Sequence, residues 1–266
     1  MYKLKLGKSV RVFDGDYYEV LENLKAYGFE SVDVDLCACG FFNRAEELEE
    51  LKKRMSVLKE SGLFFNGVHI PYGTEWDISE ADEKKRKEAV KNVLTTIAFM
   101  DAYRPNCYVL HGSFEPIMDK ERNAKLCSLI QSVKEIKSAT KTPVGIENLP
   151  RTCLLNTSDE ILYVAEQTGG MDVCLDVNHF LRERTENAIP KLSGMIVTTH
   201  ISDHDYANER HWLPKEGKIN WQKLLFELEK SGYNGVFNYE VLGSIGIADI
   251  KKNYEELFEA YNGKKL

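Results

Sequence analysis

Six apolar runs of this sequence each end in a residue that can bind a metal ion or transfer a proton. These residues are His69, His111, Glu147, Asp176, His200 and Glu240. A run that is polar only at its last residue is typical of a buried parallel strand, which delivers one side chain to the rim of a sheet. Because the carboxyl ends of such strands meet on one face of a barrel, the pattern predicts a ring of metal ligands.

Glu147, Asp176, His200 and Glu240 end four successive runs, so we expect them to converge. Three carboxylates at one point would repel and raise one another's pKa unless a divalent cation neutralised them. The alternative is a set of buried ion pairs with lysine or arginine, but no basic residue ends any of the predicted strands. Oxygen-rich ligation with one imidazole suits Mn²⁺, Mg²⁺ or Co²⁺, and it is also compatible with Zn²⁺.

Five further residues surround that group and are candidates to bind an additional metal ion or the substrate. They are His69, His111, His179, Glu209 and His211. With Glu147 shared between ions, the site would be polynuclear. For His69 and His111 the competing interpretation is a histidine that only packs.

The elements that must position these residues alternate between short apolar runs and amphipathic stretches of helical period, which is typical of repeated βα units. The predicted strands are residues 4–12, 31–36, 63–70, 107–111, 143–147, 172–176, 195–201 and 235–240. The predicted helices are residues 17–27, 45–60, 80–103, 120–137, 159–168, 221–230 and 248–261, with a weaker one at 185–192. Gly28, Gly62 and Gly232 are expected to end helices in a left-handed cap. Residues 203–218 are expected to form a long functional loop.

Eight βα units predict a single α/β domain over residues 1–266, a (β/α)8 TIM barrel with its active site at the C-terminal ends of the strands. The net charge of −7 does not favour nucleic acid as a partner. No apolar run is long enough to span a membrane and the N-terminus lacks the pattern of a secretory signal, so we expect a cytoplasmic protein. The six cysteines are expected to be reduced, and Cys37 and Cys39 could face the rim.

The order of several motifs carries a family resemblance from about residue 13 to residue 261. The motifs are Gly67-Val68-His69-Ile70-Pro71-Tyr72, Glu147, Leu175-Asp176-Val177-Asn178-His179, His200-Ile201-Ser202-Asp203 and His211-Trp212-Leu213-Pro214-Lys215-Glu216-Gly217. They resemble the xylose isomerase-like barrels, a superfamily that includes sugar isomerases and epimerases and also endonuclease IV. The set of motifs is more specific than any one of them.

The resemblance to the ketose epimerase branch implies roles for individual residues. Glu147 and Glu240 would bind one metal ion and act as the two proton-transfer groups, while Asp176 and His200 complete the metal shell. His179 would hold a substrate oxygen. The predicted function is therefore a divalent-metal-dependent isomerase or epimerase of a small ketose or polyol-derived ketone, acting through a metal-stabilised enediolate. The expected partner is a small-molecule sugar, and a homo-oligomer is compatible with this interpretation.

The resemblance to the endonuclease IV branch implies a different reaction, hydrolysis of a phosphodiester by a three-zinc cluster. The residues that match its ligands are His69, His111, Glu147, Asp176, His179, His200, His211 and Glu240, and Glu209 stands where that branch has an aspartate. Segments 74–77 and 203–205 are acidic and predict a rim that binds DNA poorly, and His204 is expected to be solvated. A lyase using the same metal and base, or a metal-binding barrel without catalysis, remain further alternatives.

Overall fold

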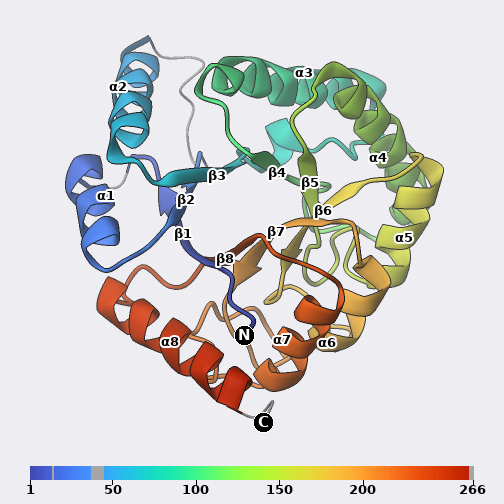
Figure 1. Cartoon of the computed structure of the whole chain (residues 1–266). Helices are drawn as coiled ribbons and strands as arrows, with labels where there is room; N and C mark the ends of the chain where they lie inside the picture. The colour runs from blue at the N-terminus through green and yellow to red at the C-terminus, as the bar shows by residue number, and fades with distance from the viewer. Residues whose placement is uncertain (14, 37–44, 264–266) are drawn as a thin grey trace.

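A closed barrel of parallel strands forms the centre of the protein (Figure 1). The structure, a computed structural model, describes residues 1–13, 15–36 and 45–263. Within these ranges eight strands pair in sequence order, and β1 pairs with β8 to close the barrel. The strands are β1 Lys5–Arg11, β2 Ser31–Asp35, β3 Phe64–His69, β4 Cys107–His111, β5 Val144–Glu147, β6 Asp172–Asp176, β7 Ile196–Ile201 and β8 Val236–Tyr239. The predicted (β/α)8 barrel is confirmed.

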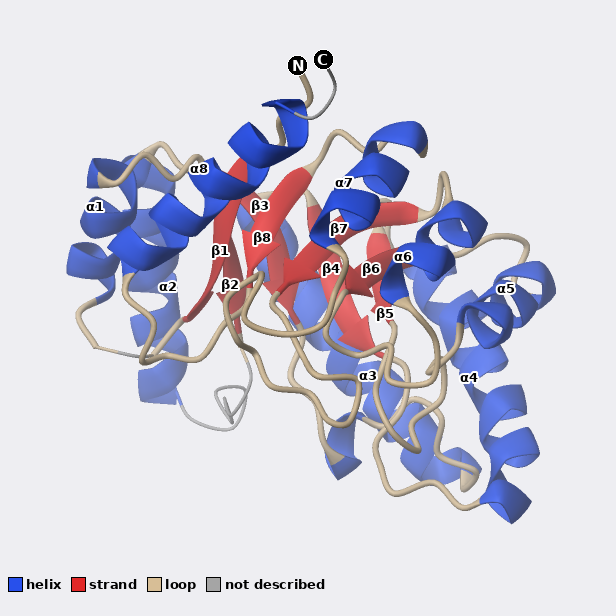
Figure 2. Cartoon of the chain, turned by 90° about the horizontal axis from the view of Figure 1, so that it is seen from below, coloured by secondary structure: helices blue, strands red, loops and turns tan. Residues whose placement is uncertain are grey.

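Helices follow the strands and surround the barrel (Figure 1). They are α1 Tyr17–Ala26, α2 Ala45–Ser61, α3 Glu83–Met100, α4 Asp119–Ala139, α5 Ser158–Gln167, α6 Thr185–Ala188, α7 Trp221–Lys230 and α8 Ile247–Gly263, with short 3₁₀ helices at η2 Thr74–Trp76, η3 Asp101–Tyr103 and η4 Ile189–Leu192. Long loops gather at one end of the barrel, and both chain termini lie at the other end (Figure 2).

Local sequence signals set the ends of several helices. The Asp16 carboxylate accepts hydrogen bonds from the backbone N–H groups of Tyr18 and Glu19 at the start of α1, which satisfies donors that a helix leaves free. Gly28, Gly62 and Gly232 have φ of 77°, 77° and 79°, a conformation that glycine adopts without steric cost. The predicted left-handed caps are confirmed.

Two predicted helices differ from the observed ones by three residues or more at one or both ends, whereas the others agree to within two residues. The helix predicted over residues 80–103 begins later, because Asp82 caps Glu83–Met100, and its last turn becomes the 3₁₀ helix η3. The helix predicted over residues 185–192 divides into α6 and η4. Pro190 lies in the first turn of η4, and its missing N–H prevents a continuous α-helix across the junction.

The loop over residues 203–218 is held by the carboxylate of Asp203, which is fully buried. Its four donors are the backbone N–H groups of His204, Lys215 and Ile219 and the indole N–H of Trp221. Gly217 passes so close that a Cβ there would lie 2.3 Å from the Asp203 Oδ1. The expectations for this segment need correction: Asp203 and His204 are buried rather than on an acidic, solvated rim, because the loop folds back over both side chains.

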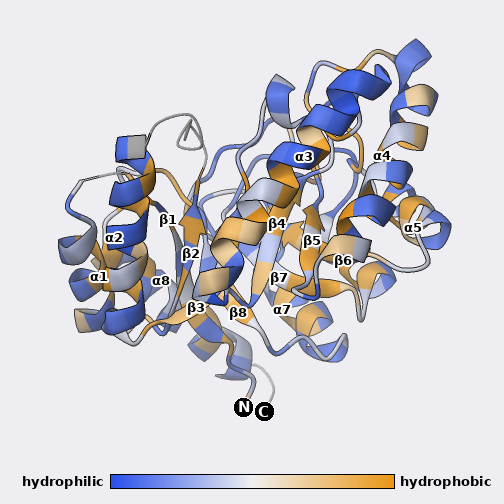
Figure 3. Cartoon of the chain, turned by 90° about the horizontal axis from the view of Figure 1, so that it is seen from above, coloured by the Kyte–Doolittle hydropathy of each residue, from blue (hydrophilic) through white to orange (hydrophobic). Residues whose placement is uncertain are grey.

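The strands are mostly hydrophobic, whereas polar residues predominate on helices such as α2 (Figure 3). A polar layer nevertheless lies in the barrel interior, where the side-chain amide of Asn66 donates to Asp33 Oδ1 at 2.7 Å and to Thr198 Oγ1 at 2.9 Å. Gly67 leaves space for the Asp33 side chain, since a Cβ at position 67 would lie 2.4 Å from Asp33 Oδ2. Burial raises the pKa of Asp33 to about 6, although His200 and the Asn66 hydrogen bond oppose the increase.

Two sequence expectations concern membrane-spanning helices and the redox state of the cysteines. None of the described helices has the length and apolar character needed to cross a membrane. Cys107, Cys127, Cys153 and Cys174 are free thiols, as expected for reduced cysteines. Cys37 and Cys39 lie outside the described residues, so their proposed place on the rim is not tested.

Asp33→Asn should stabilise the metal-free protein at alkaline pH. A carboxyl group whose folded pKa is raised from 3.8 to about 6 contributes stability below pH 3.8 that is lost as the pH rises through about 6. Asparagine removes that loss of folding stability, which amounts to about 3 kcal/mol for a pKa raised from 3.8 to about 6. Urea unfolding in a chelating buffer should show the gain at pH 8 and a much smaller one at pH 4. An equal difference at both pH values would contradict the assignment.

Candidate functional site

All nine residues that the sequence predicted for the site lie at the C-terminal end of the barrel, and eight of them, all but His111, form three groups. These groups are Glu147, Asp176, His200 and Glu240; His69, Glu147 and His200; and His179, Glu209 and His211. The strands place most of them: β3, β4, β5 and β6 end at His69, His111, Glu147 and Asp176, His200 is the penultimate residue of β7, and Glu240 follows β8. In each group, one ligand atom per residue lies within 4.8 Å of the others.

In the first group, three carboxylates surround the Nδ1 atom of His200. This nitrogen lies 2.6 Å from Glu240 Oε2, 3.1 Å from Glu147 Oε1 and 3.9 Å from Asp176 Oδ2. Glu147, Asp176 and His200 are at most 1% exposed, whereas the side chain of Glu240 is 30% exposed. The group is therefore a nearly buried cluster that is open to solvent on the Glu240 side.

The electrostatics show that this group lacks positive charge. Burial raises the pKa of Asp176 well above its ordinary value, and Glu147 and Glu240 raise it further. Burial also raises the pKa of Glu147, but His200 and His111 outweigh that effect and hold it well below its ordinary value. The His200 pKa, which burial lowers, is raised well above its ordinary value by Cys174, Glu240 and Glu147. Protons on His200 and Asp176 would thus reduce the net negative charge.

The donor set fits a divalent cation. Asp176 Oδ2 is buried and has no hydrogen-bond partner among the described residues, an arrangement that is costly unless a cation completes it. Three carboxylates and one imidazole are the ligands that Mn²⁺, Mg²⁺, Co²⁺ or Zn²⁺ would accept. Among the ion pairs of the described residues, none joins a lysine or arginine to Glu147, Asp176 or Glu240.

His69 and His111 lie against the opposite oxygen of Glu147. Their Nε2 atoms are 3.2 Å and 3.0 Å from Glu147 Oε2, and the Tyr72 ring stacks on His111 at a centroid distance of 4.5 Å. The Nδ1 of His69 lies 2.9 Å from the carbonyl oxygen of Ile70, which can only accept, so Nδ1 carries a proton. An extra proton or a metal ion at Nε2 would relieve the contact between its lone pair and the carboxylate.

His179 and His211 present their Nε2 atoms to the space beside Glu209. Each Nδ1–H donates to a backbone carbonyl, that of Asn148 at 3.0 Å for His179 and that of Glu240 at 3.1 Å for His211. These bonds favour the tautomer with a lone pair on Nε2. Since His179 Nε2 is 3.4 Å from Glu209 Oε2, the group has the composition of a metal site.

A cavity of about 240 Å³ opens above these groups and contains residues that the sequence did not reveal. Arg11 and Asp35 line it and pair with each other at 3.6 Å. They end β1 and β2, but the predicted strands continued one residue further, to apolar Val12 and Leu36, and hid both polar ends. The expectation that no strand ends in a basic residue was therefore wrong for Arg11.

The acidic rim expected over residues 74–77 is also incomplete. Asp77 is buried, where its carboxylate accepts hydrogen bonds from Ser79 and from the Lys125 ammonium at 2.9 Å. Asp205 pairs with Arg210 at 2.8 Å. Because these charges are compensated within the protein, the negative charge of the rim is smaller than the sequence indicated.

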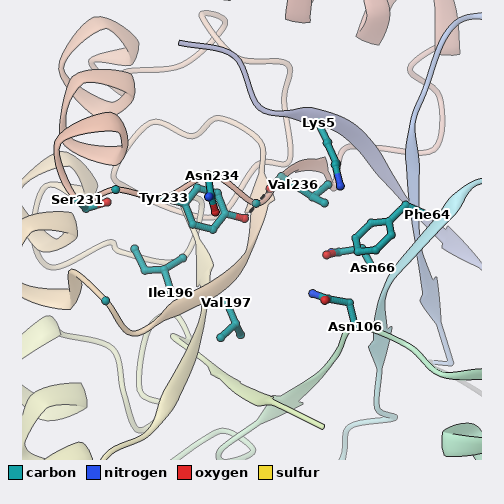
Figure 4. Close-up of a pocket in the computed structure, with 13 residues that line it drawn as sticks. Lys5, Phe64, Asn66, Asn106, Ile196, Val197, Ser231, Tyr233, Asn234 and Val236 are labelled. Carbon is teal, nitrogen blue, oxygen red and sulfur yellow. Dashed lines mark hydrogen bonds between the residues drawn. The ribbon is translucent and has the colours of Figure 1, made fainter.

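A second cavity, of about 340 Å³, lies at the opposite end of the barrel, where β1, β3, β7 and β8 begin (Figure 4). Its lining includes Lys5, Asn66, Asn106, Tyr233 and Asn234 and carries no histidine, cysteine or carboxylate. It contains none of the nine predicted site residues, and the smaller cavity above β5 and β8 is therefore the candidate functional site.

Comparisons with known proteins find relatives by sequence and structures of the same fold. The chain is 27% identical over 170 residues to an uncharacterized protein of Methanocaldococcus jannaschii, a match that covers 61% of this chain and 65% of that protein, slightly under two thirds of its length. A crystal structure of a D-tagatose 3-epimerase-like protein superposes with a TM-score of 0.82 at 20% identity, covering 99% of this chain and 100% of the other. A D-psicose 3-epimerase, crystallised in the presence of D-fructose, gives 0.77 at 16% identity, with 98% and 99% covered.

At these identities the structural likeness shows the shared fold. The sequence profile of the family described as xylose isomerase-like TIM barrel matches residues 21–262. That range includes β2 to β8 and all nine predicted site residues. The chain belongs to the xylose isomerase-like TIM barrel family.

Proposed function

We propose that this protein is a divalent-metal-dependent isomerase or epimerase of a small ketose or polyol-derived ketone. The observation that carries the proposal is the cluster of Glu147, Asp176 and Glu240 around His200, which joins a cation-binding donor set to two carboxylates that can transfer protons. The epimerase names of the structures with the same fold support the reaction class. A cavity of about 240 Å³ is suited to a small substrate.

The residues divide the chemistry between them. Glu147, Asp176, His200 and Glu240 would hold a divalent cation, which would supply the Lewis acidity that lowers the pKa of the hydrogen on the substrate carbon next to the carbonyl. Glu147 or Glu240 removes that proton, and the other carboxylate returns a proton to the same carbon. His179, which donates through Nδ1 to Asn148, orients a substrate oxygen through Nε2.

A second candidate function is phosphodiester hydrolysis by several zinc ions. It is favoured by the two further histidine groups, His69 and His111 at Glu147, and His179 and His211 at Glu209. Two or three zinc ions per chain, together with zinc-dependent cleavage of abasic DNA, would support this function. One Mn²⁺-like ion per chain would support isomerisation.

Asp176→Asn should remove the metal response without lowering the stability of the metal-free protein. Asparagine keeps an oxygen to accept from the Asn178 N–H, now 2.6 Å away, and it replaces a carboxyl group whose charged form is opposed by burial, Glu147 and Glu240. Wild type should gain about 2.7 kcal/mol of unfolding free energy at an ion concentration 100 times Kd, and the variant should gain nothing. Asp172→Asn, at the other end of β6, is the matched control. A full metal response in Asp176→Asn would remove this residue from the site.

Incubation with candidate ketoses in deuterated water should place deuterium on the carbon next to the carbonyl. Glu147→Gln and Glu240→Gln should each suppress the exchange by at least about 100-fold, the usual contribution of a general acid or base. Circular dichroism checks the fold, and Glu166→Gln on the exposed face of α5 is the control. Absence of exchange with a broad panel of free and phosphorylated sugars would count against the proposed reaction.

His69→Ala and His111→Ala should lower the metal content or the activity on the true substrate. Each variant removes an imidazole from Glu147 Oε2, so the carboxylate that binds the cation loses a fixed contact. Elemental analysis and steady-state rates measure the two effects, and His204→Ala, a buried histidine outside the three groups, is the control. Unchanged metal content and activity in both variants would assign His69 and His111 a packing role.

A further inference from the structure

A permanent positive charge, that of Arg151, lies at the edge of the His179, Glu209 and His211 group. Arg151 Nη1 lies 2.7 Å from Glu209 Oε1. The other oxygen of the same carboxylate, Oε2, faces His179 Nε2 at 3.4 Å. One carboxylate is therefore shared between a guanidinium and the space into which the imidazole points.

Arg151 is held in this position from several sides. Its Nε donates to Glu115 Oε1 at 2.8 Å, Nη2 donates to the same oxygen, and Nη1 is 3.4 Å from Asn208 Oδ1. The backbone of Arg151 is left-handed, with φ of 51°, and that of His211 has the same φ. Non-glycine residues adopt this conformation at a cost that the surrounding contacts must offset. The arginine thus bridges the loops after β4, β5 and β7 in a fixed geometry.

We propose that Arg151 acts as a built-in cation at the His179, Glu209 and His211 group, so that this group does not take a second divalent ion as readily as its donor set would allow. The guanidinium, which also pairs with Glu115, compensates part of the charge of the only carboxylate of the group. Its charge also repels a dication a few ångströms away. The proposal rests on the metal centre in the proposed function, and it assigns Arg151 control over the number of ions bound.

The contrast with the first group supports this role. Among the described ion pairs, Glu147, Asp176 and Glu240 meet histidines alone, and a cation there would meet no guanidinium. Arg151 and Glu209 are partly exposed, at 39% and 26%, so solvent screens their interaction. We therefore expect an effect of about tenfold or more on affinity, rather than complete exclusion of the ion.

The test compares Co²⁺ binding to metal-free wild type, Arg151→Gln and Arg210→Gln by equilibrium dialysis and visible absorption. Arg151→Gln should bind one more ion per chain than wild type. The Kd of that additional ion should be at least about tenfold lower than the Kd of the corresponding binding step in wild type. Arg210→Gln should match wild type, because Arg210 pairs with Asp205 and lies over the Trp212 ring rather than at Glu209. Arg151→Asn serves as a second variant, since asparagine tolerates a left-handed backbone.

The double variant Arg151→Gln/Glu209→Gln locates the additional ion and should lose it. Equal ion counts and affinities in wild type and both Arg151 variants overturn the inference and leave the proposed function standing. The inference is also overturned if wild type already holds an ion that Glu209→Gln releases. A wild-type protein that binds no Co²⁺, Mn²⁺ or Zn²⁺ at all instead overturns the metal centre of the proposed function.

Discussion

Repulsion among Glu147, Asp176 and Glu240 is the constraint on which the site depends. Parallel strands closed into a barrel bring these side chains to one place, and the described ion pairs give them histidines rather than lysine or arginine. Within the group of Glu147, Asp176, His200 and Glu240, the single imidazole offers at most one extra proton to three carboxylates. Holding such charges out of water is unfavourable unless a cation compensates them. The packed barrel and its helices must therefore supply the free energy that keeps the cluster together when no cation is bound.

Backbone carbonyls just beyond the strand ends fix the tautomers of three histidines. Ile70, Asn148 and Glu240 each directly follow a strand, at the point where the chain leaves the sheet. Their carbonyl oxygens accept from the Nδ1–H groups of His69, His179 and His211. The end of a parallel strand thus provides both a side chain for the rim and a free carbonyl that fixes the tautomer of a neighbouring imidazole. Barrel geometry supplies the donor set and its orientation together.

The same strand-end rule explains what the sequence could and could not predict. It located Glu147, Asp176 and His200 because each is the polar end of an otherwise apolar run, and the fold followed from the repeated runs. The rule did not identify Arg11 and Asp35, because an apolar residue follows each of them and the predicted strands therefore ended one residue too late.

Loop residues were harder to interpret from sequence, because their surroundings depend on how the chain folds back. Asp77, Asp203 and His204 have the composition of a solvated rim, yet each is buried. Arg151 contacts Asn208 and Glu209, which lie on another loop at least 57 residues further along the sequence. No local sequence pattern predicts these contacts.

The two proposed proton-transfer groups occupy different environments. Glu147 is 1% exposed and lies within 3.2 Å of the imidazoles of His69, His111 and His200, whereas the side chain of Glu240 is 30% exposed and its carboxylate lies 2.6 Å from His200 Nδ1. Against the effect of burial, His200 and His111 stabilise the charged form of Glu147 and hold its pKa well below the ordinary value, and His200 likewise lowers the pKa of Glu240. In the proposed reaction Glu240, as the more exposed carboxylate, is the one more open to a substrate entering from the cavity, whereas Glu147 is surrounded by imidazoles.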